Sequence, residues 1–137
     1  MLFRSALDVI DTRTGRTIAS TPLSHGGIQA VCRPQHGDLL VKTHGDLVSI
    51  DRETGDIRWV QPTSSNGNAL VADGEVVDAW VDRTTHRYGL VARDPSTGRE
   101  LDRIDLGSTG GWYDIENVQL APDGPGDVLV SALFGVA

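Results

Sequence analysis

The chain has 137 residues, 39% of them hydrophobic and 23% charged, which is enough for one folded domain with its own core. Nineteen acidic residues against 12 basic ones give a net charge of −7, which excludes nucleic acid and anionic membranes as general electrostatic partners. No apolar run reaches the roughly 18 residues that span a bilayer, so no membrane insertion is expected. Residues 1–8 show no secretory signal, and the compartment stays open.

Short predicted strands follow one another along the chain. Residues 1–23 contain two of them, and residues 116–135 contain another two. Eight more are expected in between, near 28–33, 38–43, 46–51, 56–61, 68–72, 76–82, 88–94 and 99–106. No segment shows the 3.6-residue apolar periodicity of an amphipathic helix, so we expect almost no helix.

One turn motif, Asp-x-x-Thr-Gly, occurs three times between short apolar runs, with aspartates 40 and 43 residues apart. An aspartate that opens a turn accepts hydrogen bonds from backbone N–H groups two or three residues later. The glycine takes the positive φ that closes the hairpin. The motif therefore predicts a repeated β-hairpin, and its copies comprise Asp11, Thr14 and Gly15; Asp51, Thr54 and Gly55; and Asp94, Thr97 and Gly98.

A second series of turns alternates with the first, at 35–37, 72–74 and 122–124. Each repeat then holds four short strands in about 40–45 residues, the period of β-propeller blades, WD40-like ones included. The predicted fold class is therefore all-β, with propeller blades of four antiparallel strands. The blades form a partial propeller, or half of a six-bladed ring that a second copy completes.

We interpret residues 1–137 as a single partial β-propeller. The Gly/Ser/Asn-rich segments 62–67 and 107–112 are predicted to connect blades. The expected parts are the third and fourth strands of one blade in 1–23, full blades in 27–61 and 68–106, and the first two strands of a further blade in 116–135.

The segment from Ser49 to Trp59 matches the pattern Ala-x-Asp-x-x-Thr-Gly-x-x-x-Trp at all but its first position. This pattern is the repeat motif of the pyrroloquinoline-quinone-like propeller family, which the chain resembles. In that family the tryptophan packs between neighbouring blades. The other two copies have Ala19 and Asp102 in its place, so the resemblance implies this role for Trp59 alone.

The resemblance implies several classes of function. The family includes quinoprotein dehydrogenases, outer-membrane assembly lipoproteins, and sensor or scaffold domains attached to other modules. An enzymatic member would need pyrroloquinoline quinone and Ca²⁺, which carboxylate and amide oxygens hold at the mouth of the propeller. These cofactors enter by resemblance only, because the sequence itself assigns no catalytic, cofactor-binding or metal-binding residue. Relatives are often extracytoplasmic, which leaves the localisation unassigned.

The candidate surface site comprises Trp112, Tyr113, Asp114 and Glu116. With Asn117 these carboxylates form the best oxygen cluster, since Asp114 and Glu116 would share one face of an extended strand. The favoured interpretation is nevertheless a loop that enters a strand, with Asp114 capping a turn. Trp112 and Tyr113 are interpreted as a wedge between blades rather than an exposed aromatic pair. The segment 123–127 is interpreted as a hairpin loop rather than a calcium site.

The remaining chemistry-bearing residues have structural interpretations. Cys32 is the only cysteine, so no internal disulfide forms, and no third residue orients it with His36 for nucleophilic catalysis. A buried structural cysteine is predicted instead. Lys42 is the only lysine, which we attribute to codon bias in a GC-rich genome. The histidines lack the spacing of a zinc site and are predicted to be surface loop residues: His25, His36, His44 and His86.

These observations favour a non-enzymatic propeller scaffold that binds a protein or a small ligand at one face of the propeller. The alternatives are a fragment of a quinoprotein dehydrogenase-like oxidoreductase and a sensor module severed from a larger protein. Candidate loops are the two blade connectors together with 44–45 and 84–87. We also expect a head-to-tail homodimer in which residues 4–11 pair with 127–134 of a second copy. The alternative is that the missing blades lie in a longer protein.

Overall fold

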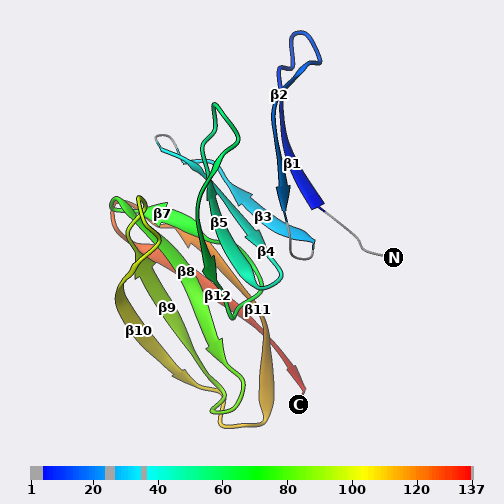
Figure 1. Ribbon diagram of the computed structural model, residues 1–137. Helices are drawn as coiled ribbons and strands as arrows, with labels where there is room; N and C mark the ends of the chain where they lie inside the picture. The colour runs from blue at the N-terminus through cyan, green and yellow to red at the C-terminus, as the bar shows by residue number, and fades with distance from the viewer. Residues whose placement is uncertain (1–4, 24–26, 35–36, 137) are drawn as a thin grey trace.

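The computed structural model describes residues 5–23, 27–34 and 37–136 (Figure 1). Within these ranges every helix or strand is a β-strand, which confirms the all-β fold class. No helix in them could cross a membrane. The strands are β1 (Ser5–Ile10), β2 (Thr17–Leu23), β3 (Ile28–Cys32), β4 (Leu39–Thr43), β5 (Asp46–Ile50), β6 (Ile57–Pro62), β7 (Leu70–Ala72), β8 (Glu75–Asp82), β9 (Arg87–Arg93), β10 (Glu100–Ser108), β11 (Tyr113–Pro122) and β12 (Val128–Val136).

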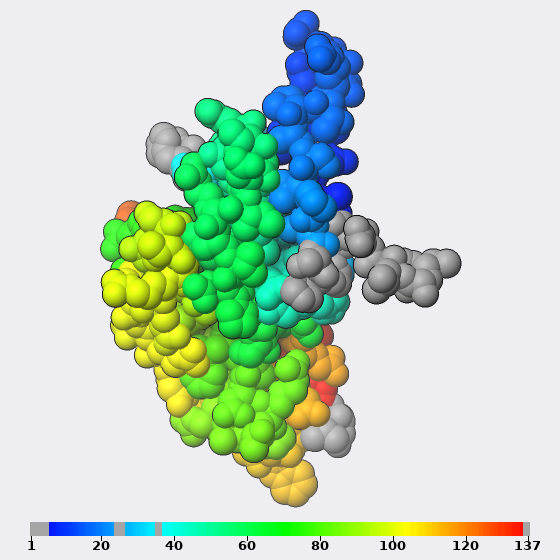
Figure 2. Space-filling model, viewed as in Figure 1, coloured from blue at the N-terminus to red at the C-terminus, as the bar shows by residue number. Residues whose placement is uncertain are grey.

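The strands form four antiparallel sheets, each in chain order: β1–β2, β3–β6, β7–β10 and β11–β12. In the two four-stranded sheets the strand bounds agree with the predicted ones to within two residues. Figure 1 shows the sheets side by side, and the β1–β2 hairpin projects from the rest of the molecule in Figure 2. The described strands do not close into a ring.

The repeated turns have the geometry that the motif predicts. Gly55 has a φ of +78° and donates its backbone N–H to the Asp51 carbonyl over 2.8 Å. The Asp51 carboxylate accepts the backbone N–H groups of Glu53 and Thr54, and the Thr54 hydroxyl accepts that of Asp56. The motif copies at Gly15 and Gly98 have φ values of +72° and +74°.

The core lies between successive sheets, as it does between propeller blades. Leu7 and Val9 of the first hairpin pack against an apolar cluster on the face of β3–β6. The opposite face of that sheet contributes Leu40 and Trp59 to a second cluster shared with β7–β10. A third cluster joins β7–β10 to β11–β12. Because each sheet is apolar on both faces where neighbours lie, the sheets stack rather than form separate domains.

Trp59 packs between two sheets, as the resemblance implies. Its side chain is 8% exposed, and its indole Nε1 donates to the carbonyl oxygen of Pro95 on the next sheet. The ring lies against Gly98, where an added Cβ would come within 2.6 Å of it. At the equivalent positions of the other repeats, Ala19 lies against Gly55, whereas Asp102 is exposed.

Candidate functional site

A pocket of about 670 Å³ lies between sheets β3–β6 and β7–β10. We call it the inter-sheet pocket. The ends of β3 and β7 and the starts of β4 and β8 bring its walls together, because the hairpin turns of both sheets lie on this side. Its walls include Cys32, Leu40, Leu70, Val71 and Val76, with Ser49 from β5.

Turn prolines form much of the rim of this pocket. Proline carries no backbone N–H, and the carbonyl oxygens of Pro34 and Pro95 already accept hydrogen bonds from Arg52 and Trp59. The rim therefore presents mainly apolar surface. The charged residues in the lining are Arg33, which is exposed, and Asp38, whose carboxylate is 2.8 Å from Nε of Arg58.

In the described chain, Ser49 contributes a hydroxyl group without a hydrogen-bond partner to this apolar pocket. Its side chain is 1% exposed, and its Oγ has no hydrogen-bond partner among the described residues. A buried polar group without a partner costs about 1–3 kcal/mol. Such groups are rare in folded proteins and call for an explanation, and a hydrogen-bonding ligand would supply one.

Cys32 lies in the wall of the same pocket and is half-buried. Burial raises the pKa of its thiol above the ordinary value, and a hydrogen bond with the backbone of Val71 lowers it by a smaller amount. The thiol therefore stays protonated near neutral pH and is a poor nucleophile. Its sequence neighbour His36 lies outside the described residues, as does His25.

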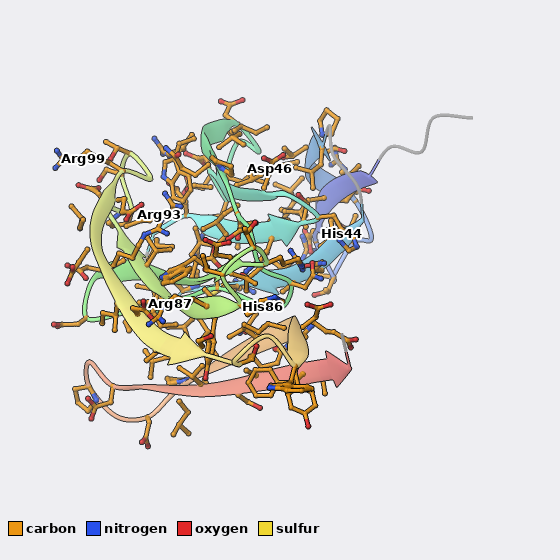
Figure 3. All side chains as sticks on the ribbon, turned by 90° about the horizontal axis from the view of Figure 1, so that it is seen from below. His44, Asp46, His86, Arg87, Arg93 and Arg99 are labelled. Carbon is orange, nitrogen blue, oxygen red and sulfur yellow. The ribbon has the colours of Figure 1, made fainter. Side chains whose placement is uncertain are left out.

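The opposite side of the molecule carries the loops that the sequence singled out. His44 is exposed and lies within hydrogen-bond distance of the Gln29 amide, which also donates to Asn66 in the connector after β6. His86 lies 3.7 Å from the carboxylate of Asp114 (Figure 3). These groups are dispersed over three sheets, and they line none of the pockets described here.

The interpretation of Trp112 and Tyr113 as a wedge between blades is wrong. Trp112 is 79% exposed and Tyr113 is 49% exposed. The physical reason is the turn before them, where Gly110 and Gly111 both have positive φ and direct the chain outward. The Thr109 hydroxyl closes this turn on the Tyr113 carbonyl oxygen.

The carboxylates of the candidate surface site do not meet as an extended strand would place them. β11 has an irregular register between Ile115 and Asn117, so the alternation of faces is interrupted at Glu116. The Glu116 carboxylate lies against Gly135, and the Asn117 side-chain oxygen accepts from Gln119 instead. In the part of the chain that the structure describes, no three His, Cys, Asp or Glu residues are placed to hold a metal ion. Asp114, Glu116 and Asn117 therefore do not fit a calcium centre.

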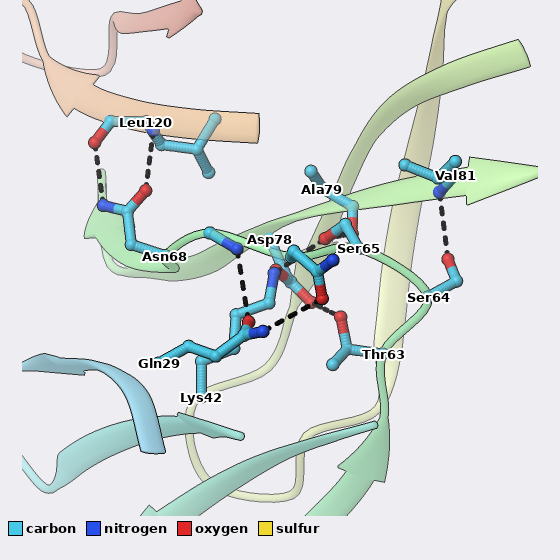
Figure 4. Close-up of polar contacts among 12 residues, drawn as sticks. Gln29, Lys42, Thr63, Ser64, Ser65, Asn68, Asp78, Ala79, Val81 and Leu120 are labelled. Carbon is cyan, nitrogen blue, oxygen red and sulfur yellow. Dashed lines mark hydrogen bonds and ion pairs between the residues drawn. The ribbon is translucent and has the colours of Figure 1, made fainter. Parts of the chain in front are cut away.

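A buried ion pair joins the two four-stranded sheets, and the sequence analysis did not predict it (Figure 4). Lys42 on β4 and Asp78 on β8 are each 1% exposed, with Nζ 2.5 Å from Oδ1. The ammonium also donates to Ser65 over 2.7 Å, and Thr63 donates to the second carboxylate oxygen. The pair is thus hydrogen-bonded from both sides, as a stable buried charge requires. Its one signal in the sequence is a charged residue in the middle of each of two apolar runs.

A smaller pocket of about 220 Å³ lies beside this ion pair. It is lined in part by Asp78 and by two arginines, Arg93 and Arg103. Arg93 is 8% exposed and donates to the Gly98 carbonyl, and Arg103 lies over the Trp80 ring at 5.2 Å. Figure 3 shows Arg93 on the inner side of β10. Asp78 and Arg103 already have charged partners, Lys42 and Glu100, whereas the buried Nε of Arg93 has no hydrogen-bond partner among the described residues.

No family model and no curated protein sequence matches the chain. Among solved structures it is similar to quinohemoprotein alcohol dehydrogenase from Comamonas testosteroni, with a TM-score of 0.55 and 24% identity over 74% of this chain and 18% of that one. It is also similar to BamB from Moraxella catarrhalis, with a TM-score of 0.54 and 18% identity over 68% of this chain and 28% of that one. The chain is a partial β-propeller.

This likeness shows the fold, a β-propeller built from four-stranded antiparallel blades. The chain spans only 18% and 28% of the lengths of the two solved structures. Activities of whole propellers therefore do not transfer to it through the fold.

Proposed function

We propose that this partial propeller is a non-enzymatic scaffold that binds a small, largely apolar ligand in the inter-sheet pocket. The observation that carries the proposal is the Ser49 hydroxyl, which is buried and without a partner in an apolar pocket of about 670 Å³. Ligand sites are typically 300–1,000 Å³ in volume, apolar in most of their lining, and equipped with a few polar groups that fix orientation. The pocket has this combination.

The lining narrows the class of ligand. Apolar walls such as Leu40 and Val76 favour a hydrocarbon or aromatic body. Ser49 would meet one hydrogen-bonding group of the ligand inside the pocket. The Asp38 carboxylate in the lining is paired with Arg58, so the exposed Arg33 favours an acidic end of the ligand. Cys32, held as a neutral thiol, adds polarizable apolar surface rather than reactivity. The ligand class is therefore an apolar carboxylate or sulfonate.

Titration with 1-anilinonaphthalene-8-sulfonate, an apolar sulfonate, tests the site. We expect one probe per chain, and we expect Val71→Trp to weaken binding more than tenfold, because the larger ring fills the pocket. Val60→Trp is the matched control, since Val60 is 47% exposed on β6 and does not line the pocket. Absence of saturable binding, or equal affinity in the two variants, would contradict the proposal.

The second candidate function is a fragment of a quinoprotein-type oxidoreductase, which the likeness to an alcohol dehydrogenase favours. A dye-reduction assay with alcohols, pyrroloquinoline quinone and Ca²⁺ distinguishes the two. The scaffold proposal predicts no turnover above the blank. Turnover that requires both the quinone and Ca²⁺ would favour the enzyme instead.

A further inference from the structure

The same contact between neighbouring sheets occurs at two places, where a motif turn of one sheet lies on a side chain of the preceding sheet. The Trp59 ring is covered by the turn at Gly98, which belongs to the next sheet. Ala19 is covered by the turn at Gly55 of its own next sheet, where an added Cβ would lie 3.1 Å from the Ala19 Cβ. Ala19 and Trp59 each stand eight residues after the aspartate of their own turn motif. This position is therefore the seat for the turn of the following blade.

The third seat is Asp102, which stands eight residues after Asp94 and is exposed. It lines a groove of about 330 Å³ between sheets β7–β10 and β11–β12. The floor of the groove is apolar, with Val77 and Leu90, and no basic residue lines it in the described part of the chain. We call it the acidic groove after the carboxylates that line it, which are Asp73, Glu75, Asp102 and Asp127.

One turn of the chain carries the complementary charge. The turn between β1 and β2 has two exposed arginines, Arg13 and Arg16. The other two turns of the motif are already seated, one against Ala19 and the other against Trp59. The basic turn is thus the copy of the motif whose charge matches the one uncovered seat.

Strands β1 and β12 are also complementary, because in the described chain each has an unpaired edge and apolar side chains on a defined face. In the described residues β1 pairs only with β2, and β12 pairs only with β11. On β12, Leu129 and Leu133 are 55% and 59% exposed, whereas Val130 faces sheet β7–β10. On β1, Leu7 faces the cluster on β3–β6. If Leu7 of one copy lies opposite Leu133 of the other, then Leu7, Leu129 and Leu133 all lie on the same face of the joined sheet, as a correct register requires.

We propose that the acidic groove receives the β1–β2 turn of a second copy, with Arg13 and Arg16 against its carboxylates. Strand β1 of that copy then pairs with β12, and the reciprocal contact is made at the other end of the pair. Two copies of the described strands, each about three blade-equivalents, then form a ring of about six blades, which lies in the known range for propellers. The assembly does not depend on a ligand in the inter-sheet pocket, which lies at a different seam.

Light scattering coupled to size exclusion, applied to the full chain, tests this assembly. We expect the wild type to have twice the chain mass of 14.7 kDa. The triple change Glu75→Arg, Asp102→Arg and Asp127→Arg, which makes the groove positive, and the double change Arg13→Asp with Arg16→Asp should each raise the dissociation constant more than tenfold, because groove and turn then carry the same sign of charge. Glu53→Arg is the control for a charge reversal elsewhere, since Glu53 lies in a turn that is already seated and its change should leave the dimer intact.

Mixing the two interface variants separates a lost contact from a damaged fold. In the mixed pair one groove and turn keep their native charges, and the other groove, made positive by the triple change, meets the acidic turn, so both contacts are attractive and the dimer should return. A wild-type mass other than two chains would overturn the proposal. So would a dimer that survives both changes, or a mixture that stays monomeric.

Discussion

The indole Nε1 of Trp59 donates a 2.8 Å hydrogen bond to the carbonyl oxygen of Pro95, across the boundary between two sheets. The donor comes from the last strand of one sheet and the acceptor from a hairpin turn of the next. Together with the contact between the ring and Gly98, this bond fixes how the sheets pack. The inter-sheet pocket, which Pro95 also lines, depends on that arrangement.

Truncation of Trp59 should therefore destabilise the chain. Trp59→Ala removes a buried aromatic ring, and such changes cost about 3–5 kcal/mol. Trp59→Phe should cost less, because it mainly leaves the Pro95 carbonyl without its donor, at about 1–3 kcal/mol. Urea unfolding measures both values. Trp112→Ala is the control, since Trp112 is 79% exposed and its loss should change stability by less than about 0.5 kcal/mol.

Substitutions at two glycines with nearly the same backbone conformation distinguish the cost of backbone strain from the cost of steric crowding. Gly15 and Gly98 have φ values of +72° and +74°, but only Gly98 has neighbours where a Cβ would be, 2.6 Å from the Trp59 ring. Gly15→Ala should cost about 1 kcal/mol for the left-handed conformation. Gly98→Ala should cost about 1–3 kcal/mol more, because the added carbon overpacks the contact. Equal unfolding free energies for the two variants would show that the turn at Gly98 is not seated on Trp59.

The strands and turns were predictable because their signals are local. An aspartate, a threonine and a glycine within five residues specify a turn without information from the rest of the chain. The inter-sheet pocket was not predictable in this way. Ser49 and Val71 line it from different sheets, and each has an ordinary place in its own strand, so no motif announces that a cavity separates them.

The sequence did not indicate the structural environments of one aromatic residue, Trp112, and one charged residue, Lys42. Trp112 was interpreted as part of a wedge between blades, but it follows the Gly110–Gly111 turn, in which both residues have positive φ, and is 79% exposed. Lys42 was attributed to codon bias, although its ammonium lies between the buried hydroxyl of Ser65 and the carboxylate of Asp78. A compact ammonium suits this site better than the planar guanidinium of arginine, which the chain uses at every other basic position apart from histidine.

The Lys42–Asp78 pair should show strong coupling. Removal of one partner leaves a buried charge uncompensated, so Lys42→Met and Asp78→Leu should each cost about 3–5 kcal/mol. The double variant replaces both charges with apolar side chains and should cost clearly less than the two single changes together. Denaturant melts of all four proteins give the coupling energy. The exposed pair of Arg87 and Asp105 is the comparison, where Asp105→Asn should cost at most about 1 kcal/mol.

The thiol of Cys32 should react slowly and should make the chain sensitive to alkali. Burial holds its pKa above the ordinary value, so the thiolate fraction near pH 8 is small and alkylation by iodoacetamide should be slower than for free cysteine. Because the folded-state pKa lies above the unfolded one, the thiol contributes stability below the unfolded pKa and loses it as the pH rises through the folded pKa. Wild-type stability should therefore fall relative to Cys32→Ala between neutral and alkaline pH. Parallel pH profiles for the two proteins, or alkylation as fast as that of free cysteine, would place the thiol in water rather than in the wall of the pocket.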